Sequence, residues 1–308
     1  MIEARDLTKV YGDKVAVNGI SFQVMPGTVT GFLGPNGAGK STTMRMIVGL
    51  DRPTAGAVTV NGKPYREHAA PLREVGVLLD AKAVHTGRSA FQHLRAMAAT
   101  HGISTRRVHE VIEMTGLDGV ADRRVGGFSL GMGQRLGIAA ALLGDPQTLI
   151  LDEPVNGLDP EGVKWVRTMV RHLAGEGRKV FISSHLMSEM AQTADDLLVI
   201  GRGRIIAAGA MTEVIAAAQR AAVRVVTPRS DDLAELLTDR GATVTTVAPG
   251  HLEVADLTNV EIGDLAAARG LPLHELTPLS ATLEDAYLDL TRDEVEYRSE
   301  TMTKEPSR

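Results

Sequence analysis

The fold of this chain is decided by the stretch Gly34-Pro35-Asn36-Gly37-Ala38-Gly39-Lys40-Ser41, which fits G-x-x-x-x-G-K-[ST] at every fixed position. The apolar residues before it, 28–33, are typical of a short strand, and residues 42–50 follow with apolar side chains at helical spacing. In this setting, glycines allow successive backbone N–H groups to surround phosphate oxygens at the positive end of the helix. The stretch therefore predicts a nucleoside triphosphate site, and the alternative is an ordinary glycine-rich turn.

Two carboxylates follow another apolar strand, Leu149-Ile150-Leu151, and complete the chemistry that a phosphate loop needs. We expect Lys40 to reach the terminal phosphates and Ser41 to ligate Mg²⁺. Asp152 ends the strand where it can hold Mg²⁺ through water, and Glu153 can act as general base toward the attacking water. The alternative for this pair is a solvated acidic turn.

A histidine, His185, follows a further apolar strand at 179–183, at the strand end where open α/β sheets bind ligands. A lone histidine is more often structural than catalytic, but its place after this strand favours a catalytic role. We therefore group His185 with Lys40 and Glu153 as candidate catalytic residues.

The composition is that of a folded protein with no marked preference for nucleic acid. Hydrophobic residues make up 44% of the 308 residues, the formal net charge is −5, and the sequence contains no cysteine. The acidic balance argues against nucleic acid as the default partner, and the lack of cysteine excludes disulfides and thiolate metal sites. No apolar run approaches the ~20 residues that span a bilayer. We therefore expect a soluble protein that reaches a membrane only through a partner.

The order of patterns along the chain predicts an α/β core interrupted by helices, because buried strands alternate with helices. We expect a nucleotide-binding domain over 1–215 with a helical subdomain at about 85–145, a small α+β accessory domain over 223–290, and a frayed tail over 292–308. Hairpin turns are expected at 11–13 and at Asn61-Gly62. The expected helices are 89–99, 106–115, 133–143, 160–173, 213–222, 231–237, 262–269 and 283–290. In the accessory domain the expected strands are 223–226, 243–247 and 252–254.

At these residues the chain resembles the ATPase subunit of ABC transporters, over residues 1 to about 215. The matching features are Tyr11 as the aromatic residue that stacks on adenine, the phosphate loop with Thr42 after it, Phe128-Ser129-Leu130-Gly131-Met132-Gly133-Gln134-Arg135 as the family signature, Asp152, Glu153, Gly157-Leu158-Asp159 and His185. The resemblance implies a P-loop NTPase fold with an antiparallel β subdomain and a helical insert. It also implies ATP and Mg²⁺ as cofactors.

In this family two domains pack head to tail, so the resemblance implies a homodimer. Each ATP then lies between one phosphate loop and the partner's Ser129 and Gly131, beside the segment of Asp159 that contacts the opposite subunit. From the residues alone, the alternative for Ser129 and Gly131 is an ordinary helix cap with a flexible turn.

Two departures from the family pattern concern coupling. Leu130 and Met132 replace a glycine and a glutamine of the usual signature, and Asp80 stands where most members carry the glutamine that touches Mg²⁺. We keep Asp80 as a candidate metal ligand, with an exposed loop carboxylate as the alternative. With this signature, the chain resembles the ABC-2 group that includes drug and antibiotic exporters, and the motif near Leu283-Glu284-Asp285 is similar to one in its C-terminal extensions.

The leading hypothesis is an energy-coupling subunit in the cytoplasm. It hydrolyses ATP at the inner face of the membrane and drives export of drug, antibiotic or lipid-like cargo through a separately encoded permease. The alternatives are a non-transport ABC ATPase acting on nucleic acid or ribosomes, and a regulatory ATP-binding module without significant turnover. The presence of both Asp152 and Glu153 argues against the last.

Overall fold

The computed structural model describes residues 1–81, 83–217, 222–279 and 283–291. The chain divides into two compact units, the first built on Met1–Met211 and the second on Thr212–Leu290, and each is described by itself. The tail expected over 292–308 lies outside the described residues.

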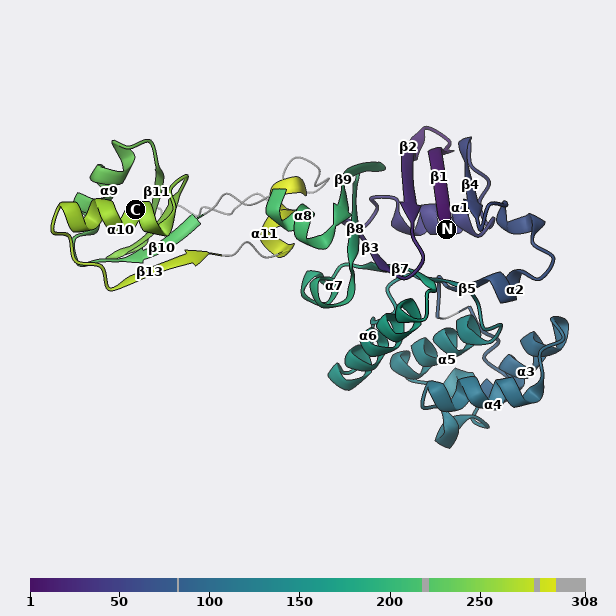
Figure 1. Ribbon diagram of the computed structural model, residues 1–308. Coiled ribbons are helices and arrows are strands. Elements are labelled where there is room, and N and C mark those ends of the chain that lie inside the picture. The colour runs from purple at the N-terminus through teal and green to yellow at the C-terminus, as the bar shows by residue number, and fades with distance from the viewer. Residues whose placement is uncertain (82, 218–221, 280–282, 292–308) are drawn as a thin grey trace, which may run out of the picture. The chain divides into compact units, whose positions relative to one another are not determined.

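The first unit is built on a six-stranded sheet whose order is β5-β6-β7-β3-β8-β9 (Figure 1). Five strands run parallel and β9 is antiparallel to β8. The strands are β3 (Val29–Leu33), β5 (Val75–Leu78), β6 (Thr148–Leu151), β7 (Lys179–Ser184), β8 (Asp196–Gly201) and β9 (Arg204–Ala210). Their central members are continuous buried apolar runs, as expected for parallel strands covered on both faces.

A second sheet in this unit is antiparallel, with the order β2-β1-β4. Its strands are β1 (Ile2–Tyr11), β2 (Lys14–Val24) and β4 (Ala55–Val60). Phe22 of β2 packs against the rings of Phe32 and Phe181 from the large sheet, with ring centroids 6.3 and 5.8 Å away. This aromatic cluster joins the two sheets in one core.

The turn predicted at Asn61-Gly62 forms with positive φ at both residues, but the hairpin prediction is wrong beyond it. Only Lys63 pairs back, with Val60, and the chain then enters the short 3-10 turn η1 (Tyr65–Glu67). Pro64 follows Lys63 and has no backbone N–H to continue the ladder.

The helices of the first unit fall into two groups. The helices α1 (Lys40–Ile47), α2 (Pro71–Glu74), α6 (Pro160–Gly175) and α7 (Met187–Thr193) contact strands of the sheets. The helices α3 (Ala90–Thr100), α4 (Thr105–Met114) and α5 (Leu130–Leu142) pack on one another, and α5 also contacts strand β5. Short 3-10 turns η2 (Asp118–Val120) and η3 (Val125–Gly127) lie between α4 and α5. The sequence predicts that α5 begins at residue 133, which is three residues late. The Ser129 side chain caps the helix, so α5 begins at Leu130.

The first helix also ends earlier than the sequence predicts. It stops at Ile47, and Gly49 follows at φ 69. Leu50, expected on the apolar face of the helix, is consequently 60% exposed. Glycine in the left-handed region is a common helix terminator, and here it overrides the apolar periodicity.

The second unit contains a four-stranded antiparallel sheet of order β11-β12-β10-β13. Its elements are α8 (Met211–Ala217), β10 (Ala222–Val226), α9 (Ser230–Thr238), β11 (Thr243–Ala248), β12 (His251–Ala255), α10 (Asn259–Ala268), β13 (Glu275–Leu279) and α11 (Leu283–Thr291). Alternate residues of β10 and β12, with leucines of α9, form a separate core. The helix expected to run to Ala222 is wrong at that end, because Ala222 pairs with Ala255 and Leu279 in the sheet.

Strand β13 was not expected from the sequence. It carries Pro278, which removes a ladder donor, and it lies at the edge of the sheet where proline is tolerated.

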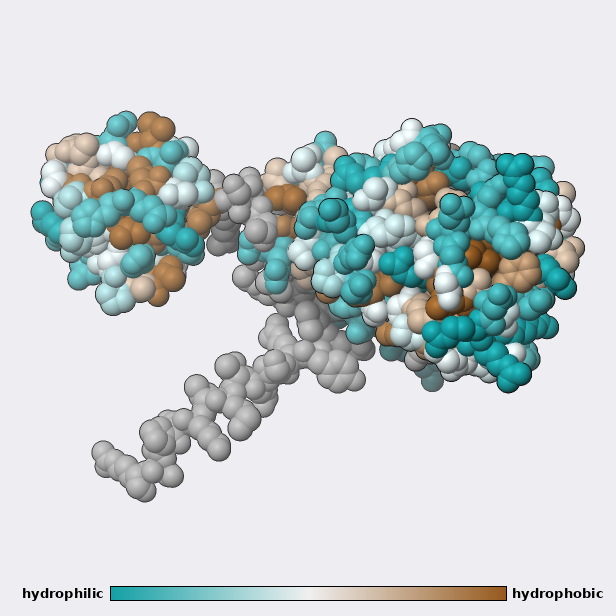
Figure 2. Space-filling view, turned by 90° about the horizontal axis from the view of Figure 1, so that it is seen from below, coloured by the Kyte–Doolittle hydropathy of each residue, from teal (hydrophilic) through white to brown (hydrophobic). Residues whose placement is uncertain are grey.

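In the described part of the chain, no helix combines the length and apolarity needed to cross a bilayer. Figure 2 shows hydrophobic residues on the visible face of each unit as separate patches among hydrophilic ones.

Candidate nucleotide site

The phosphate loop connects the end of β3 to the start of α1, as the motif requires. Gly37 and Gly39 have φ values of 82 and 111, which side chains rarely adopt. A Cβ on Gly39 would lie 2.6 Å from the Ala16 carbonyl oxygen, so this position also lacks space for a side chain. The loop therefore folds as a tight turn that presents backbone N–H groups beside the N-terminus of α1.

Lys40, the first residue of α1, lies inside this turn. Its Nζ donates to the carbonyl oxygens of Gly34 and Pro35, at 2.6 and 3.3 Å. Burial lowers the pKa of Lys40 below its ordinary value, and the nearby carboxylates of Glu153 and Asp152 offset only part of this shift. The ammonium group is therefore placed between the phosphate loop and the two acidic residues.

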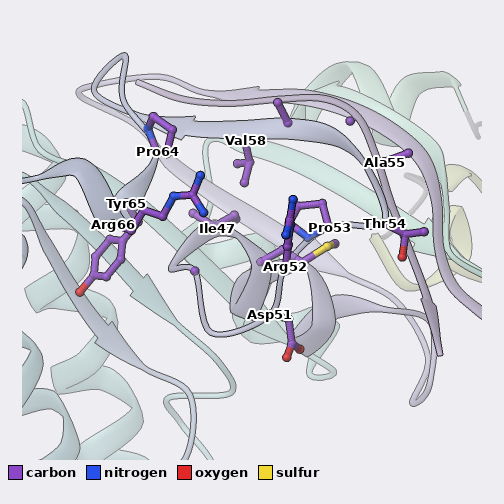
Figure 3. Close-up of a pocket in the computed structure, with 14 residues that line it drawn as sticks. Ile47, Asp51, Arg52, Pro53, Thr54, Ala55, Val58, Pro64, Tyr65 and Arg66 are labelled. Atoms are coloured by element: carbon purple, nitrogen blue, oxygen red, sulfur yellow. The ribbon is translucent and has the colours of Figure 1, made fainter.

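A pocket of about 180 Å³ brings the loop and the carboxylates together. It is lined by Ala16, Pro35, Asn36, Gly37, Gly39, Lys40, Ser41, Thr42, Asp152 and Glu153. A larger pocket of about 360 Å³ lies elsewhere, between the end of α1, β4 and η1 (Figure 3). We assign the chemistry to the smaller pocket, because Lys40 and both carboxylates line it and do not line the larger one.

Asp152 and Glu153 are held by a serine from the neighbouring strand β7. Ser183, which is fully buried, donates its hydroxyl proton to Asp152 Oδ1, and its Oγ accepts from the Glu153 backbone N–H at 2.9 Å. Glu153 has φ 49, in the left-handed region that disfavours non-glycine residues. The Gln134 side chain of α5 donates to the Glu153 carbonyl oxygen at 3.0 Å, so this backbone is fixed on both sides.

The Glu153 side chain faces His185. The Nδ1 atom of His185 lies 2.7 Å from Glu153 Oε2, and the histidine side chain is 51% exposed. The structure therefore brings together all three candidate catalytic residues, with Lys40 electrostatically coupled to Glu153 and Glu153 bonded to His185.

The residues present fit a magnesium ion that binds together with a phosphate. Ser41 and Asp152 line the same pocket and offer a hydroxyl and a carboxylate oxygen. Among the described residues, no three His, Cys, Asp or Glu side chains are grouped to hold a metal ion. One hydroxyl and one carboxylate suit Mg²⁺, which is bound by one or two carboxylates plus substrate phosphates and waters. Asp80 is not among the described residues that line the pocket.

Six of the residues predicted to bind nucleotide do not line this pocket: Tyr11, Gly34, Ala38, Ser129, Gly131 and Asp159. The Ser129 hydroxyl accepts from the Met132 N–H at 3.2 Å, and Asp159 accepts from the Gly162 N–H at 2.9 Å, so both side chains cap helices. A Cβ on Gly131 would lie 2.9 Å from the Gly157 carbonyl oxygen, which places the signature against the loop after Glu153.

Tyr11 lies at the end of the β1–β2 hairpin, whose next strand carries Ala16 into the pocket. Its side chain is exposed, its hydroxyl donates to Asp51, and this bond raises the pKa of Tyr11. The sequence reasoning missed Ala16, Ser183 and Gln134. Of these, only Gln134 carried a signal, because it stands within the signature stretch.

Comparison with known proteins places these observations in a family. A family model described as ABC transporter matches residues 17–156, and one described as a domain of unknown function matches residues 221–284. The chain is 42% identical over 209 residues to the bacitracin transport ATP-binding protein BcrA of Bacillus licheniformis, spanning 67% of this chain and 68% of BcrA. It is 36% identical over 206 residues to the lantibiotic transport ATP-binding protein SrtF of Streptococcus pyogenes, spanning 67% and 89% of the two chains.

Solved structures agree with this assignment. An ATP-binding subunit of an ABC transporter superposes with a TM-score of 0.65 at 26% identity, over 70% of this chain and 92% of that one. A dimeric ATP-binding cassette bound to ADP and Pi superposes with a TM-score of 0.64 at 20% identity, over 68% and 99%, and shows the fold alone. The phosphate loop, the paired carboxylates and these likenesses together show that the chain belongs to the ATP-binding proteins of ABC transporters and is an ATPase.

Proposed function

We propose that two copies of this chain close around ATP and that hydrolysis powers export through a separately encoded membrane permease, at the cytoplasmic face of the membrane. The observation that carries the dimer is the composition of the pocket. Lys40, Asp152 and Glu153 line it, whereas Ser129 and Gly131 of the same chain do not. A second copy that supplies its own Ser129 and Gly131 completes the site.

Within that site, each side chain has a task that follows from its contacts. Lys40 exchanges its bonds to the loop carbonyls for bonds to the terminal phosphates. Glu153 takes a proton from the attacking water, and His185 orients the Glu153 carboxylate through its Nδ1. Ser41 and Asp152, which line the same pocket, would hold Mg²⁺, and the bound ion would neutralise charge on the phosphates.

For the cargo we propose an antibiotic peptide or a similar amphiphile. The support is similarity to relatives named for bacitracin transport and for lantibiotic transport. The Nod factor export ATP-binding protein I of Burkholderia lata, 39% identical over 214 residues, spans 68% of this chain and 70% of its own length and is also named for export. No observation favours action on nucleic acid or ribosomes.

The experiment that tests the proposal is Glu153→Gln in the full chain. Loss of the carboxylate removes the base but keeps the loop, so we expect phosphate release to fall by at least about 100-fold while ATP-bound dimers accumulate. Glu113→Gln is the matched control, because Glu113 is an exposed residue of α4. Phosphate release and size-exclusion chromatography with ATP and Mg²⁺ are the measurements. Unchanged release in the Glu153 variant refutes the catalytic role, and a monomer at saturating ATP refutes the dimer.

A further inference from the structure

The hydroxyl group of Tyr11 is anchored at its far end by Asp51. The phenol oxygen donates to Asp51 Oδ2 at 2.7 Å, although the tyrosine side chain is 46% exposed. An exposed tyrosine normally samples several rotamers, and a bond to a carboxylate selects one of them. The ring therefore has a defined orientation before any ligand arrives.

Asp51 is itself fixed by Arg45, so the anchor is rigid. Arg45 Nε and Nη2 donate to Asp51 Oδ2 and Oδ1 at 2.8 and 3.3 Å. The Asp51 backbone N–H also bonds the Arg45 carbonyl oxygen at 3.2 Å. A forked contact of this kind fixes the plane of the carboxylate as well as its position.

Arg45, which fixes Asp51, belongs to the helix that follows the phosphate loop. Arg45 lies on α1, one turn beyond Ser41, and α1 begins at Lys40. The Thr42 side chain also interacts with the Tyr11 hydroxyl and lowers the pKa that Asp51 raises. Helix α1 thus contacts the phosphate loop at one end and sets the position of the Tyr11 ring through Asp51.

One face of the ring is already covered. The Lys9 ammonium lies 4.8 Å from the centroid of the Tyr11 ring and donates to the Arg52 carbonyl oxygen at 2.8 Å. A cation over one face leaves the opposite face for stacking. Asp51 also lines the large pocket, and in Figure 3 its carboxylate points away from Arg66 on the opposite wall.

We propose that Asp51 is a positioning residue. Arg45 fixes the Asp51 carboxylate, and this carboxylate holds the Tyr11 ring where a purine base stacks beside the phosphate loop. This inference rests on the proposed nucleotide function and on Tyr11 as the stacking residue. The hydrogen bond between Asp51 and Tyr11, called the tether below, acts on the base through the Tyr11 ring. The phosphate contacts are made by α1 and its loop. The tether therefore sets the affinity for ATP and leaves the chemical step unchanged.

The test compares Tyr11→Phe, Asp51→Ala and the double variant in the full chain. Each single variant removes the tether but keeps an aromatic ring, and we expect each to raise KM for ATP about fivefold with kcat unchanged. The double variant is expected to match the singles, because both changes break one bond. Inorganic tripolyphosphate, which has no base, is expected to inhibit all variants with the same Ki.

Glu3→Ala is the matched control, because it removes an exposed ion pair to Arg5 of 2.8 Å on the same strand β1. An unchanged KM in Tyr11→Phe, additive effects in the double variant, or an equal shift in the Ki of tripolyphosphate would overturn the tether. Tyr11→Leu separates this failure from that of the parent proposal. If it raises KM while Tyr11→Phe does not, stacking stands and the tether is wrong; if it leaves KM unchanged, the stacking role is wrong as well.

Discussion

The backbone of Glu153 offers the sharpest test of how this site is held, through the substitution Gln134→Met. Glu153 is in the left-handed region at φ 49, a conformation that costs about 1–3 kcal/mol for a non-glycine residue. Two hydrogen bonds oppose this cost, from Gln134 Nε2 to the Glu153 carbonyl and from the Glu153 N–H to Ser183. Each is worth about 0.5–1.5 kcal/mol net. Methionine keeps the volume of Gln134, which is 4% exposed, but removes one bond.

With one bond lost, the strain is no longer offset and the carboxylate leaves its place beside His185 in part of the population. We expect the barrier to hydrolysis to rise by about 1–2 kcal/mol, which lowers kcat roughly 5- to 30-fold. Gln134 does not line the nucleotide pocket, so the Kd for ATP should stay unchanged.

The assay is steady-state phosphate release with saturating ATP and Mg²⁺, together with calorimetric ATP binding. The control is Gln92→Met, because Gln92 is an exposed glutamine on α3. A folded Gln134 variant with wild-type kcat would refute the reasoning. So would a loss of ATP affinity as large as the loss of kcat, because the residue would then act on binding.

Three further outcomes are expected. Gly144→Ala should lower the stability of the first unit by about 1–3 kcal/mol, because the new Cβ would overlap the Leu72 carbonyl oxygen. Gly175→Ala is the control, because a Cβ there meets nothing within 4 Å and should not destabilise, and thermal unfolding compares the two variants. Hydrogen bonds from Thr258 lower the pKa of Glu261, so the capping box of α10 stabilises the fold above the ordinary glutamate pKa of 4.5 and loses that contribution as the pH falls through the lowered pKa. Glu261→Gln should therefore destabilise the protein at pH 7 and have a smaller effect in acid. Chemical denaturation at both pH values measures the difference. Chelation of Mg²⁺ with EDTA should abolish phosphate release, and added Mg²⁺ should restore it; release that continues in EDTA contradicts the assigned roles of Ser41 and Asp152.

Local patterns predicted most elements of both units. Runs such as Thr148–Leu151 are apolar on every residue and form the buried parallel strand β6. The helix expected at 262–269 forms as α10, but it begins earlier, at Asn259, where Thr258 and Glu261 make a capping box that the sequence analysis did not use. The predictions are wrong where pairing within a sheet outweighs the local preference of a residue. Ala222 has high helix propensity but pairs with two strands. Pro278 argues against a strand in the sequence, yet it lies in β13 because the edge of the sheet tolerates proline.

The family and the contiguous part of the site could be read from the sequence for a different reason. A phosphate loop is a backbone structure made by neighbouring residues, so its chemistry is written in one short stretch. Ser183 and Asp51 could not be found in this way. Each acts on a residue distant in sequence, Ser183 on Asp152 and Asp51 on Tyr11, and serine and aspartate are common residue types.

By itself, the sequence determined that this chain builds a strand–loop–helix phosphate site, that two carboxylates follow a buried strand, and that a second folded segment comes after the nucleotide-binding core. The folded chain was needed to show that Ser183 and Gln134 hold Glu153 in a left-handed backbone, and that Arg45 and Asp51 fix the ring of Tyr11. The physical reason is range: backbone turns and periodicity are set by neighbours along the chain, whereas these hydrogen bonds join side chains that only the packed sheets and helices bring within 3.5 Å of one another.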